Sequence, residues 1–317
     1  MTGSAGTPFG AGVVTVLPHA DASVVDAVHR AGGRVAPLGD DTRGIVWVAN
    51  SGSGDLAAAL ERHPDVAWVQ LPWAGVDSFA GTLRRFRDDG RIWTSAKGSY
   101  ARPVAEHALM LALSVLREVP RRARARTWQA DERGHSLFGA RVVLLGGGGI
   151  TEELLRLLSP FGVQATVVRR REAPVEGAAR TVTDSALPEV LGGADVLFVA
   201  SALTERTRGM IGAAELAALP EGAVLVNVAR GALVDTDALV AELASGRLGG
   251  AGLDVTEPEP LPTGHPLWQL DNALVTPHVA DTEAMTVPLF AERVEANVAA
   301  LLGRGEWVGR IDLHAGY

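Results

Sequence analysis

The sequence predicts an α/β protein with two doubly wound domains, each built on a parallel sheet. Its 317 residues correspond to about two domains of ordinary size. Short β-rich segments alternate with helical segments along most of the chain, which is typical of βαβ units. This alternation occurs as two series, and the second series starts after residue 140.

The first series contains predicted strands rich in Val, Ile and Trp, at residues 11–17, 44–48 and 66–71. Segments rich in Ala, Asp and Arg lie between them, and residues 21–31 and 54–62 are predicted helices. A helix between two consecutive strands allows those strands to pair in parallel. The first series therefore predicts a parallel sheet with helical connections.

The second series is more apolar, as expected for strands buried on both faces of a doubly wound sheet. The predicted strands are residues 141–145, 163–168, 195–200, 223–229, 250–255 and 273–276. A Gly-rich turn follows the first of these strands and leads into a helix from about Thr151. A further helix is predicted over residues 235–245, with Gly246 as its C-terminal cap.

A helix over residues 102–119 joins the two series. Pro103 suits its first turn, and Pro120 should break it. Its side chains are apolar nearly all round, which predicts burial on more than one side at a domain or subunit interface. The final helix, residues 282–302, is long enough to cross back onto the first domain.

Composition and charge exclude several classes of protein. The chain has no Cys, which excludes a disulfide scaffold, a zinc–thiolate site and a cysteine nucleophile. A net charge of −8 argues against nucleic-acid binding and against electrostatic docking on an anionic membrane. The basic run at residues 121–126 is therefore interpreted as a solvated helix face. No Lys or Arg precedes Arg30 and no apolar stretch reaches ~20 residues, so we expect a cytoplasmic protein without a membrane span.

The Gly-rich turn predicts a dinucleotide site. It fits the pattern G-x-G-x-x-[GA] except at the last position, which is Thr151. The first Gly permits a tight turn, the second allows the backbone to approach a pyrophosphate, and the helix N-terminus attracts its charge. The candidate residues in this turn are Gly146, Gly148, Gly149 and Ile150.

Three charged residues lie just beyond the ends of predicted strands: Arg230, Glu259 and His278. Ligands of open α/β sheets bind outside the carboxyl ends of the strands, so these side chains can converge on one crevice. A Glu can fix the tautomer of a His, and the planar guanidinium of Arg can hold a carboxylate or carbonyl. Each also has a purely structural interpretation: a loop histidine, a solvated turn carboxylate, and an arginine that caps a helix.

Several ordered motifs resemble the D-isomer-specific 2-hydroxyacid dehydrogenase family. They are Ala74-Gly-Val-Asp77, Val104-Ala-Glu-His107, the Gly-rich turn, Leu203-Thr-Glu-Arg-Thr207, Asn227-Val-Ala-Arg-Gly231, Gly252-Leu-Asp-Val255, Glu257-Pro-Glu-Pro-Leu261 and Pro277-His278. Glyoxylate/hydroxypyruvate reductases look like the nearest branch. The resemblance implies a flavodoxin-like substrate domain (residues 1–98 and 283–317) and a Rossmann-type cofactor domain (residues 99–282), with dimerisation through the helix at 102–119.

The resemblance also implies a role for individual residues. His278 would be the general acid/base, Glu259 its carboxylate partner, and Arg230 the group that binds the substrate carbonyl and carboxylate. The amides of Gly75 and Val76 would hold the other end of that carboxylate, in a substrate-binding segment that also includes Trp73 and Ala74. Asp254 would lie on the nicotinamide side of the cofactor. The remaining implied cofactor residues are Ser201, Leu203, Thr207, Ala229 and Ala280.

Some residues depart from the family pattern. Thr151 replaces the last glycine of the turn, and its β-branched side chain should push helix and strand slightly apart. Asp281 stands where a small or amide residue is commoner, and residues 95–100 lack the usual Asn. Trp73 and Tyr100 are large, so they either reshape the acyl pocket or simply pack in the core.

These features predict an NAD(P)-dependent enzyme that moves a hydride between nicotinamide C4 and C2 of a 2-ketoacid or D-2-hydroxyacid, without a metal. Arg169 and Arg170 follow the second strand after the Gly-rich turn, where NAD-selective sites carry a carboxylate, so NADP(H) should be preferred over NAD(H). The alternative from another class is a nucleotide-sensing corepressor-like protein on the same fold. Formate dehydrogenase is disfavoured, because the partner of His278 would then be Gln. We expect a homodimer.

Overall fold

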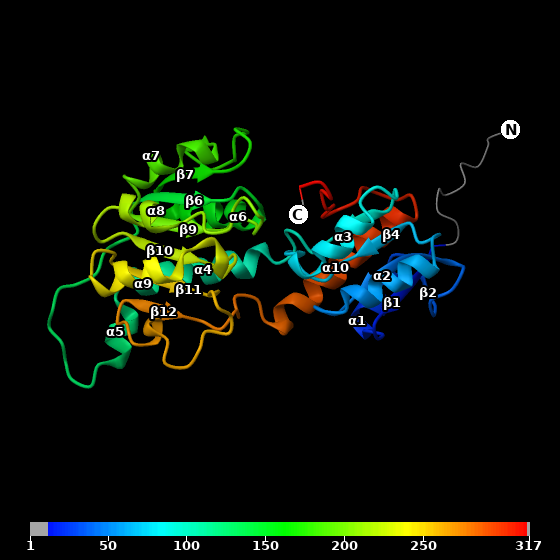
Figure 1. Cartoon of the computed structure of the whole chain (residues 1–317), viewed down its shortest axis with the longest axis horizontal. Coiled ribbons are helices and arrows are strands. Elements are labelled where there is room, and N and C mark those ends of the chain that lie inside the picture. The colour runs from blue at the N-terminus through cyan, green and yellow to red at the C-terminus, as the bar shows by residue number, and fades with distance from the viewer. Residues whose placement is uncertain (1–11, 316–317) are drawn as a thin grey trace. The chain divides into compact units, whose positions relative to one another are not determined.

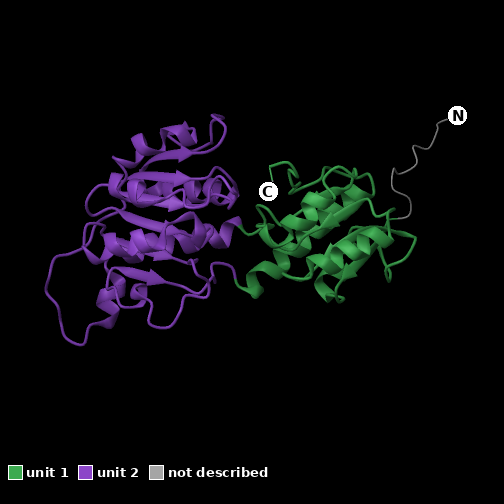
Figure 2. Ribbon diagram, in the orientation of Figure 1, with its two compact units in different colours: residues 1–100, 282–317 green, residues 101–281 purple. Residues whose placement is uncertain are grey.

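The computed structural model describes residues 12–315 and divides the chain into two compact units (Figures 1 and 2). Unit 1 comprises residues 1–100 and 282–317, and unit 2 comprises residues 101–281. The chain thus changes unit after residue 100, where the sequence predicts 98, and again before residue 282, where it predicts 283. Residue 11, the first of the predicted strand 11–17, lies outside the described range, as do the ten residues before it, which bear on the expected absence of a targeting signal.

Unit 1 contains a five-stranded parallel sheet in the order β2-β1-β3-β4-β5, the strand order of flavodoxin-like folds. The strands are β1 (Val13–Leu17), β2 (Arg34–Val35), β3 (Thr42–Trp47), β4 (Trp68–Gln70) and β5 (Ile92–Thr94). The helices are α1 (Ala22–Arg30), α2 (Ser53–Arg62), α3 (Ala80–Arg85) and α10 (Glu283–Leu301), with the short η1 (Asp77–Phe79). The predicted final helix is thus α10, which packs against α1 and completes this unit.

Unit 2 contains a seven-stranded parallel sheet in the order β12-β11-β10-β9-β6-β7-β8. The strands are β6 (Arg141–Leu145), β7 (Gln164–Val168), β8 (Arg180–Val182), β9 (Val196–Val199), β10 (Val224–Asn227), β11 (Gly250–Leu253) and β12 (Ala273–Val275). The strand order reverses between β6 and β9, the point where a Rossmann-type sheet opens its ligand crevice. The predicted Rossmann-type and flavodoxin-like domains are therefore both present.

Helices flank the sheet of unit 2 and surround its apolar strands (Figure 1). They are α4 (Ala101–Leu116), α5 (Val119–Arg124), α6 (Gly149–Leu158), α7 (Leu187–Leu191), α8 (Ala213–Ala218) and α9 (Thr236–Ala244). Short 3-10 turns are η2 (Ser159–Phe161), η3 (Asp184–Ala186), η4 (Gly231–Leu233) and η5 (Pro266–Trp268). The core includes the fully buried Leu144, Leu197, Phe198 and Leu225.

The helix predicted at residues 102–119 ends earlier than expected. α4 stops at Leu116, and Glu118 adopts a left-handed backbone conformation with a φ of 53°. Pro120 then lies in the first turn of α5, where its missing N–H costs nothing. The chain therefore breaks before the proline, and α5 begins as a separate helix.

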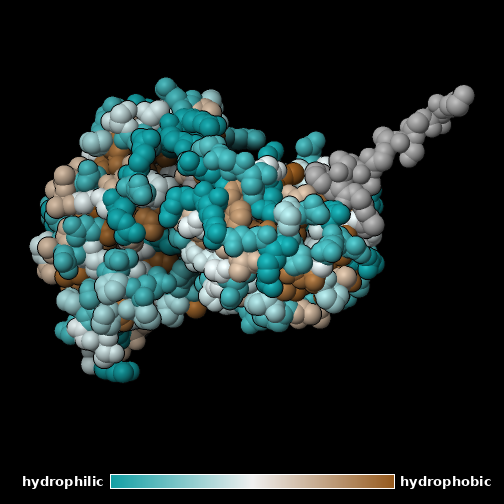
Figure 3. Space-filling view, turned by 45° about the vertical axis from the view of Figure 1, so that its right-hand side comes forward, coloured by the Kyte–Doolittle hydropathy of each residue, from teal (hydrophilic) through white to brown (hydrophobic). Residues whose placement is uncertain are grey.

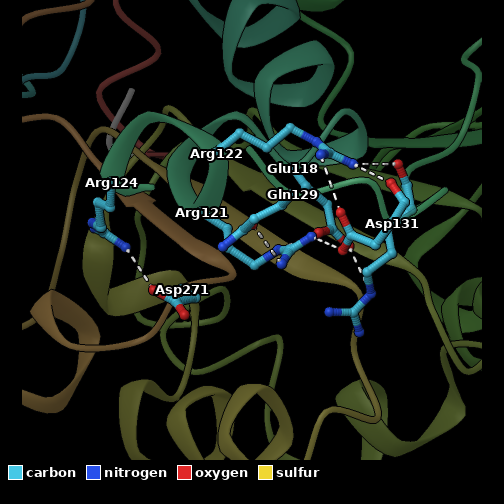
Figure 4. A network of polar contacts seen from close by, with 8 residues as sticks. Glu118, Arg121, Arg122, Arg124, Gln129, Asp131 and Asp271 are labelled. Carbon is cyan, nitrogen blue, oxygen red and sulfur yellow. Dashed lines mark hydrogen bonds and ion pairs between the residues drawn. The ribbon is translucent and has the colours of Figure 1, made fainter. Parts of the chain in front are cut away.

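The basic run at residues 121–126 is only partly a helix face. Arg121 donates to Glu118 (2.8 Å) and Gln129 (3.1 Å) and pairs with Asp131, which also contacts Arg122 at 3.3 Å (Figure 4). The Arg121 side chain is only 21% exposed. Arg121 and Arg122 are thus only partly exposed, and their guanidinium groups tie α5 to residues 129–133, whereas Arg124 and Arg126 are exposed.

The surface is mixed in character. On the face seen in Figure 3, hydrophilic and hydrophobic residues are interspersed. Exposed large apolar side chains include Trp128 and Phe138 in unit 2 and Met285 in unit 1. Within residues 12–315, no helix combines the length and the apolarity that a membrane span requires.

Candidate active site

The carboxyl ends of β10, β11 and β12 carry three loops of unit 2 that hold the predicted catalytic residues. The first two loops are in direct contact, because a Cβ on Gly231 would lie 2.0 Å from the backbone of Thr256. Only glycine fits there, and its absence of a side chain lets the Arg230 loop pack on the Glu259 loop. The contact at Gly231 thus explains why the loop after β10, which carries Arg230, lies next to the loop after β11, which carries Glu259.

Arg230 is positioned by a side chain that the sequence analysis did not assign. Asn227, at the end of β10, donates from Nδ2 to the Arg230 carbonyl (2.9 Å) and accepts from the Ala229 N–H (3.0 Å). It is 1% exposed, so these bonds fix the turn from inside the unit. The Arg230 guanidinium donates to the Ala229 carbonyl at 2.7 Å, and the side chain remains half-buried.

His278 and Glu259 form a direct pair. His278 Nδ1 lies 2.7 Å from Glu259 Oε1, and the two side chains are 44% and 41% exposed. A carboxylate accepts only, so the bond requires a proton on Nδ1 and leaves Nε2 as the imidazole nitrogen outside this bond. The Glu259 carboxylate also receives the Thr256 N–H at 3.5 Å. This arrangement fits a histidine that exchanges a proton through Nε2.

Asp254 anchors the loop that carries His278. Its Oδ1 accepts from the Thr276 hydroxyl (2.6 Å) and the Val279 N–H (2.9 Å), and its Oδ2 accepts from the Ala280 N–H (3.0 Å). Burial alone would raise the pKa of Asp254, but His107, Thr276 and these two backbone N–H groups outweigh it and hold the pKa below its ordinary value. The carboxylate is therefore ionised and satisfied from within the unit, whereas the resemblance assigns Asp254 and Ala280 to the cofactor.

Asp281 is the next carboxyl group along this loop. Burial raises the pKa of Asp281 above its ordinary value; the charge of His278 acts against this rise, and the Asp254 carboxylate adds to it. Arg230 also acts on Asp281 and favours its ionised form. The departure from the family pattern at this position thus places a second acidic group within electrostatic range of His278.

The Gly-rich turn has the shape expected of a phosphate cradle. Gly146 has a φ of 111°, and a Cβ there would lie 2.5 Å from the Ala200 carbonyl at the end of β9. A Cβ on Gly148 would meet no atom within 4 Å, so open space lies beside the backbone just before α6. Gly149 and Ile150 form the first turn of α6, whose N–H groups lack acceptors within the helix. These features fit a pyrophosphate at the helix N-terminus.

Thr151 does more than add bulk to the turn. It is fully buried, and its hydroxyl donates to the Gly146 carbonyl at 2.8 Å. The Thr151 hydroxyl therefore links the start of α6 to the first glycine of the turn. A third glycine would instead let helix and strand approach closely. This bond gives the departure from the pattern a structural role.

The expected adenosine-side residues lie around the ends of β7 and β9. The Arg169 side chain packs over the turn, since a Cβ on Gly147 would lie 2.9 Å from Arg169 Cδ. Thr207 closes the loop after β9 by donating to the Ala202 carbonyl at 2.8 Å, and Ser201 adjoins Gly146. The other predicted positions nearby are Arg170, which is exposed, Leu203, which is half-buried, and Ala229, which is buried.

The predicted substrate-binding segment belongs to unit 1. The Trp73 ring packs edge-on against Tyr100 with centroids 5.9 Å apart, and the Tyr100 hydroxyl donates to the Pro72 carbonyl at 2.7 Å. Ala74 is exposed, Gly75 is half-buried and Val76 is buried. Tyr100 thus packs against and hydrogen-bonds to residues 72–73, which directly precede Ala74 and Gly75.

Metal binding is not indicated by the described residues. Within residues 12–315, no group of three or more His, Asp or Glu side chains could hold a metal ion.

Comparison with known proteins places the chain among characterised relatives. A family model for the NAD binding domain of D-isomer specific 2-hydroxyacid dehydrogenases matches residues 107–280. Glyoxylate/hydroxypyruvate reductase B of Yersinia enterocolitica is 36% identical over 261 residues, which is 78% of each chain. Human glyoxylate reductase/hydroxypyruvate reductase is 37% identical over 174 residues, 55% of this chain and 53% of that protein. A D-isomer specific 2-hydroxyacid dehydrogenase of Xanthobacter autotrophicus Py2, solved with NADPH and MES, has a TM-score of 0.81 and 29% identity over 97% of this chain and 100% of that one.

Proposed function

The chain belongs to the D-isomer specific 2-hydroxyacid dehydrogenases, and from that premise we propose that it reduces a small 2-ketoacid, or oxidises the matching D-2-hydroxyacid. The observation that carries this proposal is the 2.7 Å contact between His278 Nδ1 and Glu259, on loops after β12 and β11. The relatives named glyoxylate/hydroxypyruvate reductases support a small 2-ketoacid as substrate.

The cofactor, when bound, supplies or accepts the hydride at nicotinamide C4. In the reductive direction, the His278 imidazolium gives its Nε2 proton to the carbonyl oxygen as C2 gains the hydride, and the product is a hydroxyl group. The Glu259 carboxylate stabilises the imidazolium before transfer and keeps the remaining proton on Nδ1. In the oxidative direction, the same imidazole removes the hydroxyl proton.

Arg230 is proposed to bind the carbonyl and carboxylate of the substrate. Negative charge develops on the carbonyl oxygen in the transition state, and a fixed guanidinium lowers the energy of that charge. The Asn227 bonds to the Arg230 backbone hold the turn in place before substrate arrives. The resemblance to the family is the basis for proposing the amides of Gly75 and Val76 as donors to the substrate carboxylate.

NADP(H) is the proposed cofactor, with NAD(H) as the weaker alternative. Arg169 follows β7, and its side chain packs over Gly147 of the dinucleotide turn. The chain carries no Asp or Glu between Leu154 and Arg171, so the carboxylate that binds a ribose 2′-hydroxyl in NAD-selective sites is missing. A guanidinium binds a 2′-phosphate bidentately, and the NADPH bound to the Xanthobacter structure supports this choice.

Cofactor preference is tested with kcat/KM for NADPH and NADH on one good 2-ketoacid. A charge-assisted bond of about 1.5–3 kcal/mol predicts a roughly ten- to hundredfold preference for NADPH. The variant Arg169→Asp should reverse or abolish this preference. Arg180→Asp makes the same change of charge on β8, where Arg180 pairs with Glu189 at 3.1 Å, and should leave the preference unchanged. Equal values for both cofactors in the wild type would contradict the assignment.

Activity is tested by NADPH oxidation with glyoxylate, hydroxypyruvate and larger 2-ketoacids, with His278→Ala as the matched blank. Turnover that requires both the ketoacid and His278 supports the proposal. Oxidation at the level of the blank with every ketoacid, by folded enzyme that still binds NADPH, refutes it.

We also propose a homodimer, as is expected from α4, and sedimentation equilibrium decides this separately.

A further inference from the structure

His107 takes no part in the mechanism above, yet it contacts the residues that hold the His278 loop. It lies on α4 and is 15% exposed. Its Nε2 lies 2.9 Å from the Thr276 hydroxyl and 3.4 Å from Asp254 Oδ1. His107, Thr276 and Asp254 therefore form one polar cluster, in which Asp254 is buried and the other two residues are half-buried, at the loop after β12.

The direction of the hydrogen bonds in this cluster follows from the ionised state of Asp254. A carboxylate cannot donate, so the single hydroxyl proton of Thr276 goes to Asp254 at 2.6 Å. The hydroxyl oxygen then accepts from His107, which requires the proton on Nε2 of His107. The chain of donors runs from α4 through Thr276 into the carboxylate.

The segment held in this way is strained. His278 has a φ of 54°, which is uncommon for a residue with a side chain. Its N–H is shared between the carbonyls of Asp254 (2.8 Å) and Thr276 (3.0 Å). A conformation that is unfavourable for a residue with a side chain persists only when its surroundings determine it. The Asp254 carboxylate provides this determination, because it accepts from the Thr276 hydroxyl before His278 and from the Val279 and Ala280 N–H groups after it.

A regular spacing brings His107 to Asp254. A Cβ on Gly250 would lie 2.5 Å from Val115, and one on Gly252 would lie 2.8 Å from Leu111. Four residues of helix advance about 6 Å, and two residues of strand advance about 6.6 Å. One further step in each direction leads from Leu111 to His107 and from Gly252 to Asp254. The two glycines let α4 approach β11 closely enough for this contact.

We propose that His107 is a positioning residue for the reaction: through Thr276 and Asp254, it holds residues 276–280 in the turn that aims the His278 imidazole. The proposal rests on the proposed function only for the identity of the reaction. His107 touches neither substrate nor reacting atoms, so its loss should lower kcat and leave substrate binding nearly intact.

The test compares His107→Leu, which has no donor, with His107→Gln, whose side-chain amide can reach the position of Nε2. In the Leu variant, kcat should fall about ten- to a hundredfold, the scale of a small misplacement of a catalytic group. KM should change by less than about threefold. The Gln variant should recover most of kcat. Thr276→Val should reproduce the Leu variant, and adding His107→Leu to it should cause little further loss.

Hydrogen exchange of the Val279 and Ala280 amides provides a readout that does not need turnover. Exchange should be about tenfold faster in the Leu and Val variants and near the wild-type rate in the Gln variant. Unchanged exchange and kcat in the Leu variant, or equal losses in the Leu and Gln variants, overturn the proposal. If Leu is not tolerated at 107, Thr276→Val and His107→Gln decide the matter in the same way. If the wild type turns over no ketoacid, the proposed function fails, and the exchange rates still decide the role of His107.

Discussion

Replacing Asp254 with Asn should destabilise unit 2 although the two side chains have nearly the same shape. Oδ1 of Asp254 accepts two bonds and Oδ2 accepts one, all from residues 276–280, and the residue is 2% exposed. An amide group has only one accepting atom. Whichever way the amide of Asp254→Asn is turned, its NH2 group points at a backbone N–H that has lost its acceptor, either that of Val279 or that of Ala280.

The size of the effect follows from the groups left unpaired. A buried donor without an acceptor costs about 1–3 kcal/mol, and the bonds that remain lose the help of a full charge. We therefore expect the free energy of unfolding of unit 2 to fall by about 2–4 kcal/mol. The matched control is Asp271→Asn, because Asp271 is 67% exposed and pairs with Arg124 at 3.5 Å. This surface pair should contribute less than about 1 kcal/mol.

The pH dependence of this difference gives a second check. The pKa of Asp254 is lowered from 3.8, so its stabilisation is present above the unfolded-state value and is lost as the pH falls through the lower folded-state value. The wild type and Asp254→Asn should therefore differ by a constant amount between about pH 8 and pH 5, and the difference should shrink only below about pH 4. Urea unfolding of the wild type and of Asp254→Asn measures the difference in the free energy of unfolding. Calorimetry, or hydrogen exchange of unit 2, provides an independent measurement. A loss below about 0.5 kcal/mol, or a difference that already shrinks between pH 7 and pH 5, would refute the reasoning.

Three further predictions concern the loops around this anchor. His278→Ala and Arg230→Ala should each lower kcat/KM about 10²- to 10⁴-fold with unchanged circular dichroism, and near wild-type turnover in either would contradict the mechanism. Glu259→Gln keeps a hydrogen bond but removes the charge that stabilises the imidazolium, so ketoacid reduction should decline at a lower pH than in the wild type; superimposable pH–rate profiles would count against the pair. The pKa of Asp281 is raised above 3.8, so this carboxyl favours the folded state at low pH, and that contribution is lost as the pH rises through the folded-state value. Asp281→Asn should therefore raise the melting temperature at pH 7 and give a smaller gain near pH 4, and a lower melting temperature at pH 7 would reverse the sign of the argument.

The sequence pattern was sufficient for the central strands and for the edge strand β12, and insufficient for the other three edge strands. β6, β9 and β10 are buried on both faces, and their apolar segments are recognisable without any structure. β2, β5 and β8 were not predicted, and all three are edge strands of two or three residues. An edge strand has one neighbour and needs less apolar surface, so its short segment resembles a turn.

In the candidate site, too, some residues can be located from the strand pattern, whereas others can be located only from the packing of the loops. Arg230, Glu259 and His278 follow strands that the sequence identifies, and parallel strands end at a common edge. The residues that hold these loops, Asn227 and Thr276, are small polar side chains whose hydrogen bonds depend on the turn geometry. Their only signal in the sequence is their place: Asn227 begins the motif that contains Arg230, and Thr276 directly precedes Pro277-His278.

His107 differs from these residues, because the sequence does hold a regular signal for it. His107, Leu111 and Val115 occur at intervals of four on a helix, while Asp254, Gly252 and Gly250 occur at intervals of two on a strand. These intervals correspond to nearly equal distances, so a helix that runs antiparallel to the strand matches the two sets in order. What the sequence lacks is the information that α4 packs on β11. Once that contact is given, the apolar face predicted for a subunit or domain interface divides in two: one side covers the glycines of β11 and ends at the Asp254 anchor, while Met110 on the other side remains 39% exposed. The same helix that was expected to join subunits therefore also reaches the loop that carries His278.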